Sequence, residues 1–80
     1  MKIFIKYFGL IKDITHLREE VFEIKNNMSV LQFIEENLYS KYSELSEIDF
    51  RIAINNKLCE NNHQINNEDH LSLLPFFSGG

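Results

Sequence analysis

The sequence predicts a small α+β domain in which a mixed β-sheet is covered on one face by one main helix. Three observations support this prediction: the opening residues alternate in character, a middle segment spaces its apolar residues as a helix does, and a late apolar segment alternates again. Of the 80 residues, 44% are hydrophobic and 25% are charged, a composition typical of globular and not of disordered chains. We therefore expect one domain over residues 1–75 and a tail over residues 76–80.

The first two predicted strands form a hairpin. Residues 2–8 alternate, with Ile3, Ile5 and Tyr7 on one face and Phe4, Lys6 and Phe8 on the other. Residues 19–27 contain the second strand, whose buried face consists of Phe22 and Ile24, before two turn-forming asparagines end it. Between them, residues 10–17 are expected to form a connector with some helical character.

The main helix is predicted within residues 28–42. Its apolar positions recur with helical spacing at Val30, Phe33, Ile34, Leu38 and Tyr42. Ser29 is the expected N-cap, and Gln32 three residues later completes a capping box.

Three further strands follow the helix. Residues 49–56 alternate, with Phe50, Ile52 and Ile54 on one face and Arg51, Ala53 and Asn55 on the other. A tight turn of Asn55, Asn56 and Lys57 is expected to lead into a short strand at 58–59, followed by polar turns. In the last strand, residues 70–75, Leu71 and Leu73 face the core and Leu74 faces away, and Pro75 ends the ladder because it has no N–H to donate.

The predicted order is therefore β-β-α-β-β-β, with the first and last strands paired in parallel at the sheet centre. This is the arrangement of the β-grasp, or ubiquitin-like, fold. The sheet side of the core is expected to consist of Ile3, Ile5, Phe22, Ile24, Ile52, Ile54, Leu71 and Leu73.

Several function classes find no support in the residues. The formal net charge of −4, with no Lys/Arg cluster in the sequence, argues against a nucleic-acid partner. His16, His63 and His70 show no metal-ligand spacing, and the single Cys59 is expected to be a buried or half-buried thiol in a reducing cytoplasm. Neither a membrane span nor a phosphate-binding glycine loop is apparent, so we expect no membrane partner, no metal site and no cofactor bound by the chain itself.

The tail offers the most specific chemistry. Because glycine lacks a Cβ, Gly79 and Gly80 fit a channel too narrow for side chains. The reactive group expected there is the α-carboxylate of Gly80, which becomes a good acyl donor once it is adenylated. The tail therefore predicts a carried acyl group that a partner enzyme activates.

The whole chain resembles the small, sulfur-carrier subunit of molybdopterin synthase, the MoaD family. The resemblance is carried by KYFGLIKDI, MSVLQFI, RIAINNKLC, NNED and LLPFFSGG, in that order. Two positions depart from the family pattern: Lys12 stands where an arginine is frequent, and Pro75-Phe76 stands where two prolines are frequent. Both concern partner contact.

The resemblance implies two partner proteins. An adenylating enzyme related to ubiquitin-activating enzymes (MoeB-like) would use ATP and magnesium to form an acyl-adenylate on Gly80, which a sulfur donor converts to a thiocarboxylate. The large catalytic subunit of molybdopterin synthase (MoaE-like) would then pass the sulfur to a cyclic pyranopterin phosphate in molybdenum cofactor biosynthesis. The chain would be a subunit of a sulfurtransferase complex that supplies the thiocarboxylate and no catalytic side chains of its own.

Strand alternation also predicts a partner-docking face. Phe4, Phe8 and Leu74 lie on the sheet face away from the helix, where Leu58 is expected to join them, and Phe76 and Phe77 continue the apolar stripe toward the tail. The alternative is that the connector, residues 10–17, folds over these side chains. Two other functions stay open: a sulfur carrier for thiazole synthesis or for tRNA thiolation and protein tagging, and a β-grasp interaction module without conjugation chemistry.

Overall fold

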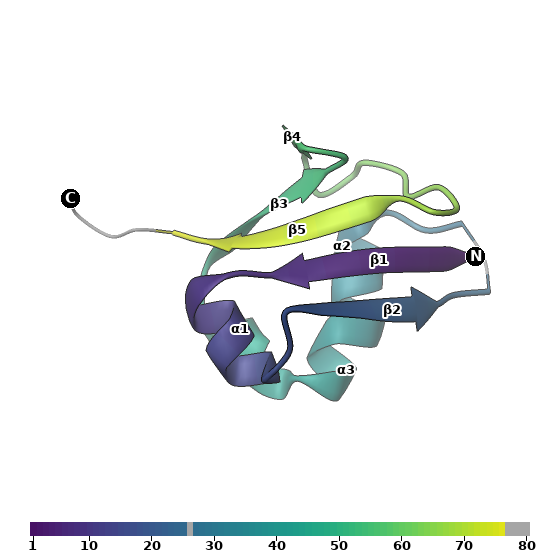
Figure 1. The fold of residues 1–80 in the computed structure, drawn as a ribbon. Helices are drawn as coiled ribbons and strands as arrows, with labels where there is room; N and C mark the ends of the chain where they lie inside the picture. Colours follow the sequence, from purple (N-terminus) through teal and green to yellow (C-terminus); the bar gives the residue numbers. More distant parts are fainter. Residues whose placement is uncertain (26, 77–80) are drawn as a thin grey trace.

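The computed structural model describes residues 1–25 and 27–76 and shows a five-stranded mixed sheet with helices packed on one face (Figure 1). Along the sheet the strands follow the order β2-β1-β5-β3-β4, where the bounds are β1 Lys2–Tyr7, β2 Glu19–Glu23, β3 Phe50–Ile54, β4 Lys57–Leu58 and β5 His70–Pro75. Strands β1 and β5 are parallel, and the other neighbours are antiparallel. The predicted β-grasp fold is confirmed.

The main helix is one continuous run of three segments. These are α2 (Val30–Phe33), the π-helical segment η1 (Ile34–Leu38) and α3 (Tyr39–Lys41). The predicted capping box is present: the amide N–H of Gln32 donates to Ser29 Oγ at 3.2 Å, and the amide N–H of Ser29 donates to Gln32 Oε1 at 3.4 Å. This box fixes where the helix begins.

A second helix, α1 (Gly9–Thr15), occupies the segment expected to be a connector with some helical character. Figure 1 shows it at the end of β1, close to the turn that follows the main helix. Ile11 and Thr15 are buried, and a 3₁₀ turn, η2 (Ser43–Glu47), adds Leu45 to the same core. The two elements together close the end of the core that the main helix leaves open.

The core lies between the sheet and the helices. The predicted sheet-side residues are buried except Phe22, which is half-buried and packs edge-on against Phe33 with ring centroids 5.3 Å apart. Ile11, Leu45 and Ile65, all fully buried, were not predicted as core. The buried apolar residues of the cluster are Ile3, Ile5, Tyr7, Ile11, Ile24, Val30, Phe33, Ile34, Leu38, Leu45, Ile52, Ile54, Ile65, Leu71 and Leu73.

Several strand boundaries differ from the prediction. Strand β1 ends at Tyr7 and not at residue 8, and β3 spans Phe50–Ile54 and not residues 49–56. Strand β2 ends at Glu23, before the predicted limit at residue 27. The turn after β3 consists of only two residues, Asn55 and Asn56, so β4 begins at Lys57 and not at residue 58. Both asparagines have positive φ, 50° and 72°, which asparagine tolerates better than most residues and which two-residue hairpins require.

A cluster around Glu20 ties the first hairpin to the end of the main helix. The hydroxyls of Tyr7 and Tyr42 donate to Glu20 Oε1 at 2.7 and 2.8 Å, and Lys41 Nζ donates to Glu20 Oε2. Burial alone would raise the pKa of Glu20, but the hydrogen bonds from Lys41, Tyr7 and Tyr42 outweigh it and hold that pKa below its ordinary value. Glu20 is therefore an ionised anchor between β2 and the helix.

Candidate functional site

We call the sheet face opposite the helices the outer face. It is built from the strand residues that alternate with the core residues, and the pairing registers place them side by side across β2, β1, β5, β3 and β4. Its central members are Val21, Phe4, Lys6, His70, Ser72, Leu74, Arg51, Ala53 and Leu58.

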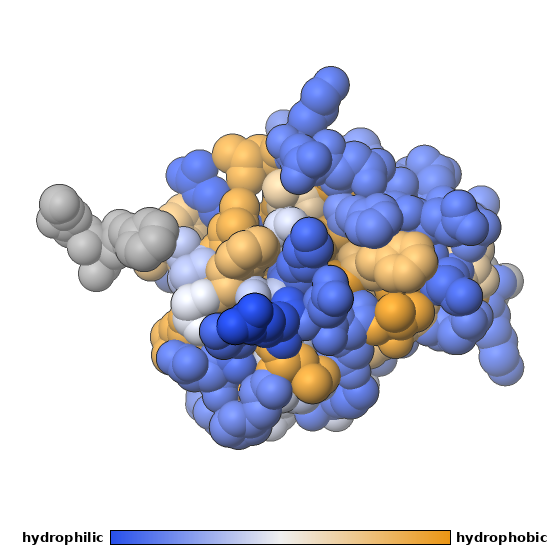
Figure 2. All heavy atoms as spheres, in the orientation of Figure 1, coloured by the Kyte–Doolittle hydropathy of each residue, from blue (hydrophilic) through white to orange (hydrophobic). Residues whose placement is uncertain are grey.

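Apolar side chains are prominent on the outer face. Leu58 is 60% exposed and Val21 is 52% exposed, while Phe4 and Leu74 are half-buried. Phe4 stacks on the His70 ring with centroids 4.7 Å apart. Figure 2 shows apolar surface on this side of the molecule, interrupted by hydrophilic side chains. The structure thus puts the predicted Phe4, Leu58 and Leu74 on one face; their role as a partner site stays a prediction.

Val21 was not among the predicted docking residues. Its register partner is Phe4, so it extends the apolar surface onto β2. The signal was present in the sequence, because assigning Phe22 to the core face assigns its neighbour Val21 to the other face.

Phe8 lies where β1 ends and α1 begins. It is 43% exposed, and the helix that follows directs Ile11 and Thr15 toward the core, so the connector leaves Phe8 uncovered. A shallow depression of about 490 Å³ beside it is also lined by Lys6, Lys12 and Arg18. The fold therefore brings together three cations that are spaced six residues apart in the sequence, with the acidic Glu19 beside them.

The tail root is the point where the chain leaves the sheet at Pro75 and Phe76. Pro75 still pairs with Phe50 of β3. On one side, a Cβ built on Gly9, whose φ is +54°, would lie 3.0 Å from Pro75 Cγ. On the other side, Arg51 Cζ lies 4.8 Å from the centroid of the half-exposed Phe76 ring.

The remaining predicted site residues lie beyond this point. Phe77, Gly79 and Gly80 lie outside the described residues, so their roles stay predictions.

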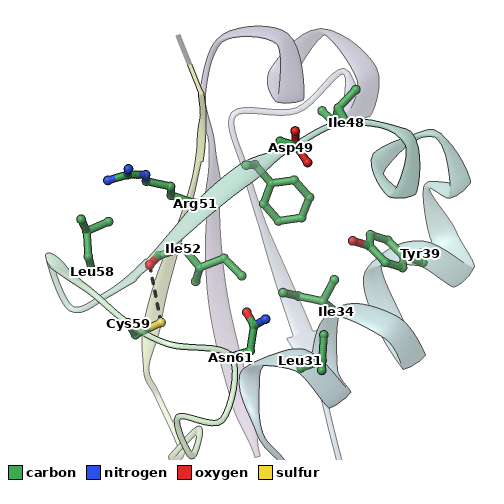
Figure 3. A pocket seen from close by; sticks show the side chains of 11 residues that line it. Leu31, Ile34, Tyr39, Ile48, Asp49, Arg51, Ile52, Leu58, Cys59 and Asn61 are labelled. Carbon is green, nitrogen blue, oxygen red and sulfur yellow. Dashed lines mark hydrogen bonds between the residues drawn. The ribbon is translucent and has the colours of Figure 1, made fainter. Parts of the chain in front are cut away.

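Another cavity, of about 410 Å³, lies between the main helix and the β3–β4 edge (Figure 3). Cys59 lines it, and its Sγ donates to the Ile52 carbonyl oxygen at 3.5 Å. Burial raises the pKa of the Cys59 thiol, which keeps it protonated at neutral pH and disfavours a nucleophilic role. The predicted half-buried thiol is confirmed.

Within the described ranges 1–25 and 27–76, the side chains do not form a metal centre. No group of three or more His, Cys, Asp or Glu side chains is placed to hold an ion there. The same part of the chain contains no helix with both the length and the apolar composition to cross a membrane.

Comparison with known proteins gives a consistent assignment. Residues 5–80 match the model of the ThiS family. Among solved structures, a Pyrococcus furiosus protein named as a molybdopterin converting factor subunit 1 is similar at a TM-score of 0.85 and 21% identity, covering 92% of this chain and 95% of that one. SAMP1 from Haloferax volcanii is similar at 0.85 and 17% identity, covering both chains fully.

A third similar structure is a complex of subunits 1 and 2 of the molybdopterin-converting factor from Helicobacter pylori, at a TM-score of 0.60 and 24% identity, with both chains fully covered. At these identities the three structures establish the shared fold. The family match covers nearly the whole chain, including the tail root and the two terminal glycines. The chain therefore belongs to the ThiS family, and it is a ubiquitin-like sulfur carrier.

Proposed function

We propose that this carrier is the small subunit of molybdopterin synthase, with the Gly80 carboxylate as the group that receives and delivers sulfur. The observation that supports it most is the outer face: its exposed apolar surface runs to the tail root, from which the sequence continues through Gly79 and Gly80. A docking surface next to a side-chain-free arm is what delivery of a terminal acyl group requires.

The proposed reaction begins with activation. A Gly80 carboxylate oxygen attacks the α-phosphorus of ATP, pyrophosphate leaves, and an acyl-adenylate forms in the active site of an adenylating enzyme (MoeB-like) that holds the ATP and magnesium. A sulfide-equivalent donor then attacks the acyl carbon, AMP leaves, and the product is a thiocarboxylate. The chain's own contribution is to bind, to extend its tail and to present one carbon atom.

The second half of the cycle takes place in the large catalytic subunit (MoaE-like). The thiocarboxylate sulfur passes to the cyclic pyranopterin phosphate, and water supplies the oxygen that restores the Gly80 carboxylate. Six residues from Pro75 to Gly80 reach roughly 20 Å when extended. Docking through the outer face is therefore compatible with an active site buried well inside the partner.

One of the similar structures contains a partner subunit, and this supports a partner of this kind for the present chain. The Helicobacter pylori structure is a complex of subunits 1 and 2. In our proposal the outer face of this chain, with Phe4, Leu58 and Leu74, takes the corresponding contact together with Phe8 at the end of β1. Phe76 and Phe77 would then anchor the start of the tail at the partner's channel.

Reconstitution with purified components tests the proposal. The carrier is charged by the activating enzyme with ATP, magnesium and sulfide, and is then mixed with the large synthase subunit and cyclic pyranopterin phosphate. We expect a dithiolene-containing pterin to form in proportion to thiocarboxylate consumed. A thiocarboxylate that forms but is not consumed by the large subunit would reject the molybdopterin assignment and keep the carrier chemistry.

The alternative functions predict different outcomes when the purified protein is assayed. A thiazole-pathway carrier would transfer its sulfur only to a thiazole synthase system. A carrier for tRNA thiolation or protein tagging would thiolate tRNA or form conjugates to lysine residues. A β-grasp module without conjugation chemistry would form no acyl-adenylate at all.

A further inference from the structure

We propose that Gly9 and Arg51 are positioning residues that form a collar around the tail root and fix the direction in which the chain leaves the sheet. The collar consists of Gly9 and Arg51, and the tail-root residues that they contact are Pro75 and Phe76. This inference rests on the proposed carrier function, because it concerns how the tail is presented to the activating enzyme.

The first half of the collar is a close approach of Gly9 to Pro75, at a position whose backbone conformation favours glycine. Gly9 has a φ of +54°, a conformation that costs other residues energy. A Cβ at this position would lie 3.0 Å from Pro75 Cγ, and the proline ring is too rigid to give way. The backbone at the start of α1 therefore lies directly against Pro75.

The second half of the collar comes from β3, the strand that flanks β5 on the side opposite β1. Arg51 belongs to β3 and pairs with Leu74, and its guanidinium carbon lies 4.8 Å from the centroid of the Phe76 ring. Arg51 lines the cavity of Figure 3 at its edge, and the figure shows its side chain directed away from Ile34 and Tyr39. A guanidinium over an aromatic ring at this distance is a cation–π contact.

The two halves act on the same short segment from both sides. Strand β5 lies between β1 and β3, Gly9 follows β1, and Arg51 is part of β3. Pro75 contributes a fixed φ of its own and is still paired to Phe50. The contacts thus order the chain through Phe76, beyond its last ladder pair.

Ordering the tail root in the free carrier lowers the entropy that is lost when the tail enters an active site. Loss of the collar should weaken productive association while the chemistry at Gly80 proceeds normally once the tail is seated. The expected signature is a raised KM for the carrier with an unchanged kcat.

The test is a double-mutant cycle on Arg51→Met and Phe76→Leu, measured by ATP–pyrophosphate exchange with the activating enzyme at varied carrier concentration. An exposed cation–π contact corresponds to about a two- to fivefold change in KM. We expect each single variant to raise KM by about that factor, and the double variant to add little. Lys25→Met removes the same charge far from the tail root and should leave KM unchanged.

Three kinetic outcomes would overturn the collar. If the two effects multiply, Arg51 and Phe76 act independently. If kcat falls while KM is constant, Arg51 acts on the chemistry and not on presentation. If KM falls in Arg51→Met, the guanidinium holds Phe76 away from the partner instead of presenting it.

A measurement on the free protein separates failure of the collar from failure of the proposed function. The backbone order parameter of Phe76, from ¹⁵N relaxation, should fall in Arg51→Met and in Gly9→Ala. If it is unchanged in Arg51→Met, the collar is wrong whatever the enzyme assays show. If it falls but the parent carrier is never activated, the collar holds and the proposed function is wrong. Thermal unfolding of Gly9→Ala shows whether that variant is folded, and Arg51→Met carries the test if it is not.

Discussion

Phe8→Ala should weaken binding to the large synthase subunit by about thirtyfold while leaving the domain folded. Phe8 is 43% exposed in the free chain. A phenylalanine buries roughly 200 Å² when it is fully covered, so docking would remove roughly 85 Å² more from water. At about 25 cal/mol per Å², this corresponds to about 2 kcal/mol, or about thirtyfold in Kd.

The assay is isothermal titration calorimetry of carrier variants into the large subunit, with thermal unfolding of each free variant measured in parallel. Leu31→Ala is the matched control, because Leu31 is 41% exposed but lies on the main helix, on the other side of the sheet. Its Kd should equal that of the parent chain. Phe8→Asp should weaken binding further, since the interface would desolvate a charge.

Equal losses of affinity in Phe8→Ala and Leu31→Ala would refute the docking argument, because the outer face would then have no special role. Loss of the cooperative unfolding transition in Phe8→Asp would refute the assignment of Phe8 to the exposed surface. Either result can be obtained without knowledge of the sulfur chemistry.

Three other perturbations follow from the structure. The free energy of unfolding should decrease in acid, because the folded-state pKa of Glu20 lies below its ordinary value of 4.5: its stabilisation is complete above that value and is lost as the pH falls through the folded pKa. Glu20→Gln should flatten this acid slope in urea titrations at several pH values and cost about 1–3 kcal/mol at neutral pH; an unchanged slope would contradict the role of the cluster. Ile54→Ala, which truncates a buried core residue, should cost about 2–5 kcal/mol in the same titrations, and a cost below about 1 kcal/mol would place Ile54 outside the core. Gly79→Val should fold and bind both partners but lose ATP-dependent pyrophosphate exchange, because a β-branched side chain blocks a channel shaped for bare backbone; exchange at the parental rate would remove the argument from a narrow channel.

Local patterns account for the parts of the fold that were predicted. The capping box of Ser29 and Gln32, the alternation in β1 and the positive-φ turn at Asn55 and Asn56 are all specified by a few adjacent residues. Each carries its own physical signal, so the elements and the sheet faces follow from short stretches of sequence.

The residues that were missed depend on contacts that are distant in sequence. Ile65 stands alone in a polar segment and Leu45 in a short 3₁₀ turn, so no period reveals that either is fully buried. The contact of Arg51 with Phe76 requires the β3–β5 register, which strand patterns do not determine. The same holds for the cations beside Phe8, which only the packed fold brings together.

The most direct test of the carrier function is the intact mass of the chain after incubation with its activating enzyme, ATP, magnesium and sulfide. The parent chain should gain the mass difference of one oxygen exchanged for sulfur. A variant with one alanine added after Gly80 moves the reacting carbonyl by about 3.5 Å, and a misplacement of only about 1 Å can cost about a hundredfold in rate. We therefore predict that this variant folds and binds normally but acquires almost no sulfur. Sulfur incorporation at the parental rate, with the added alanine still in place, would contradict the assignment of Gly80 as the reactive end.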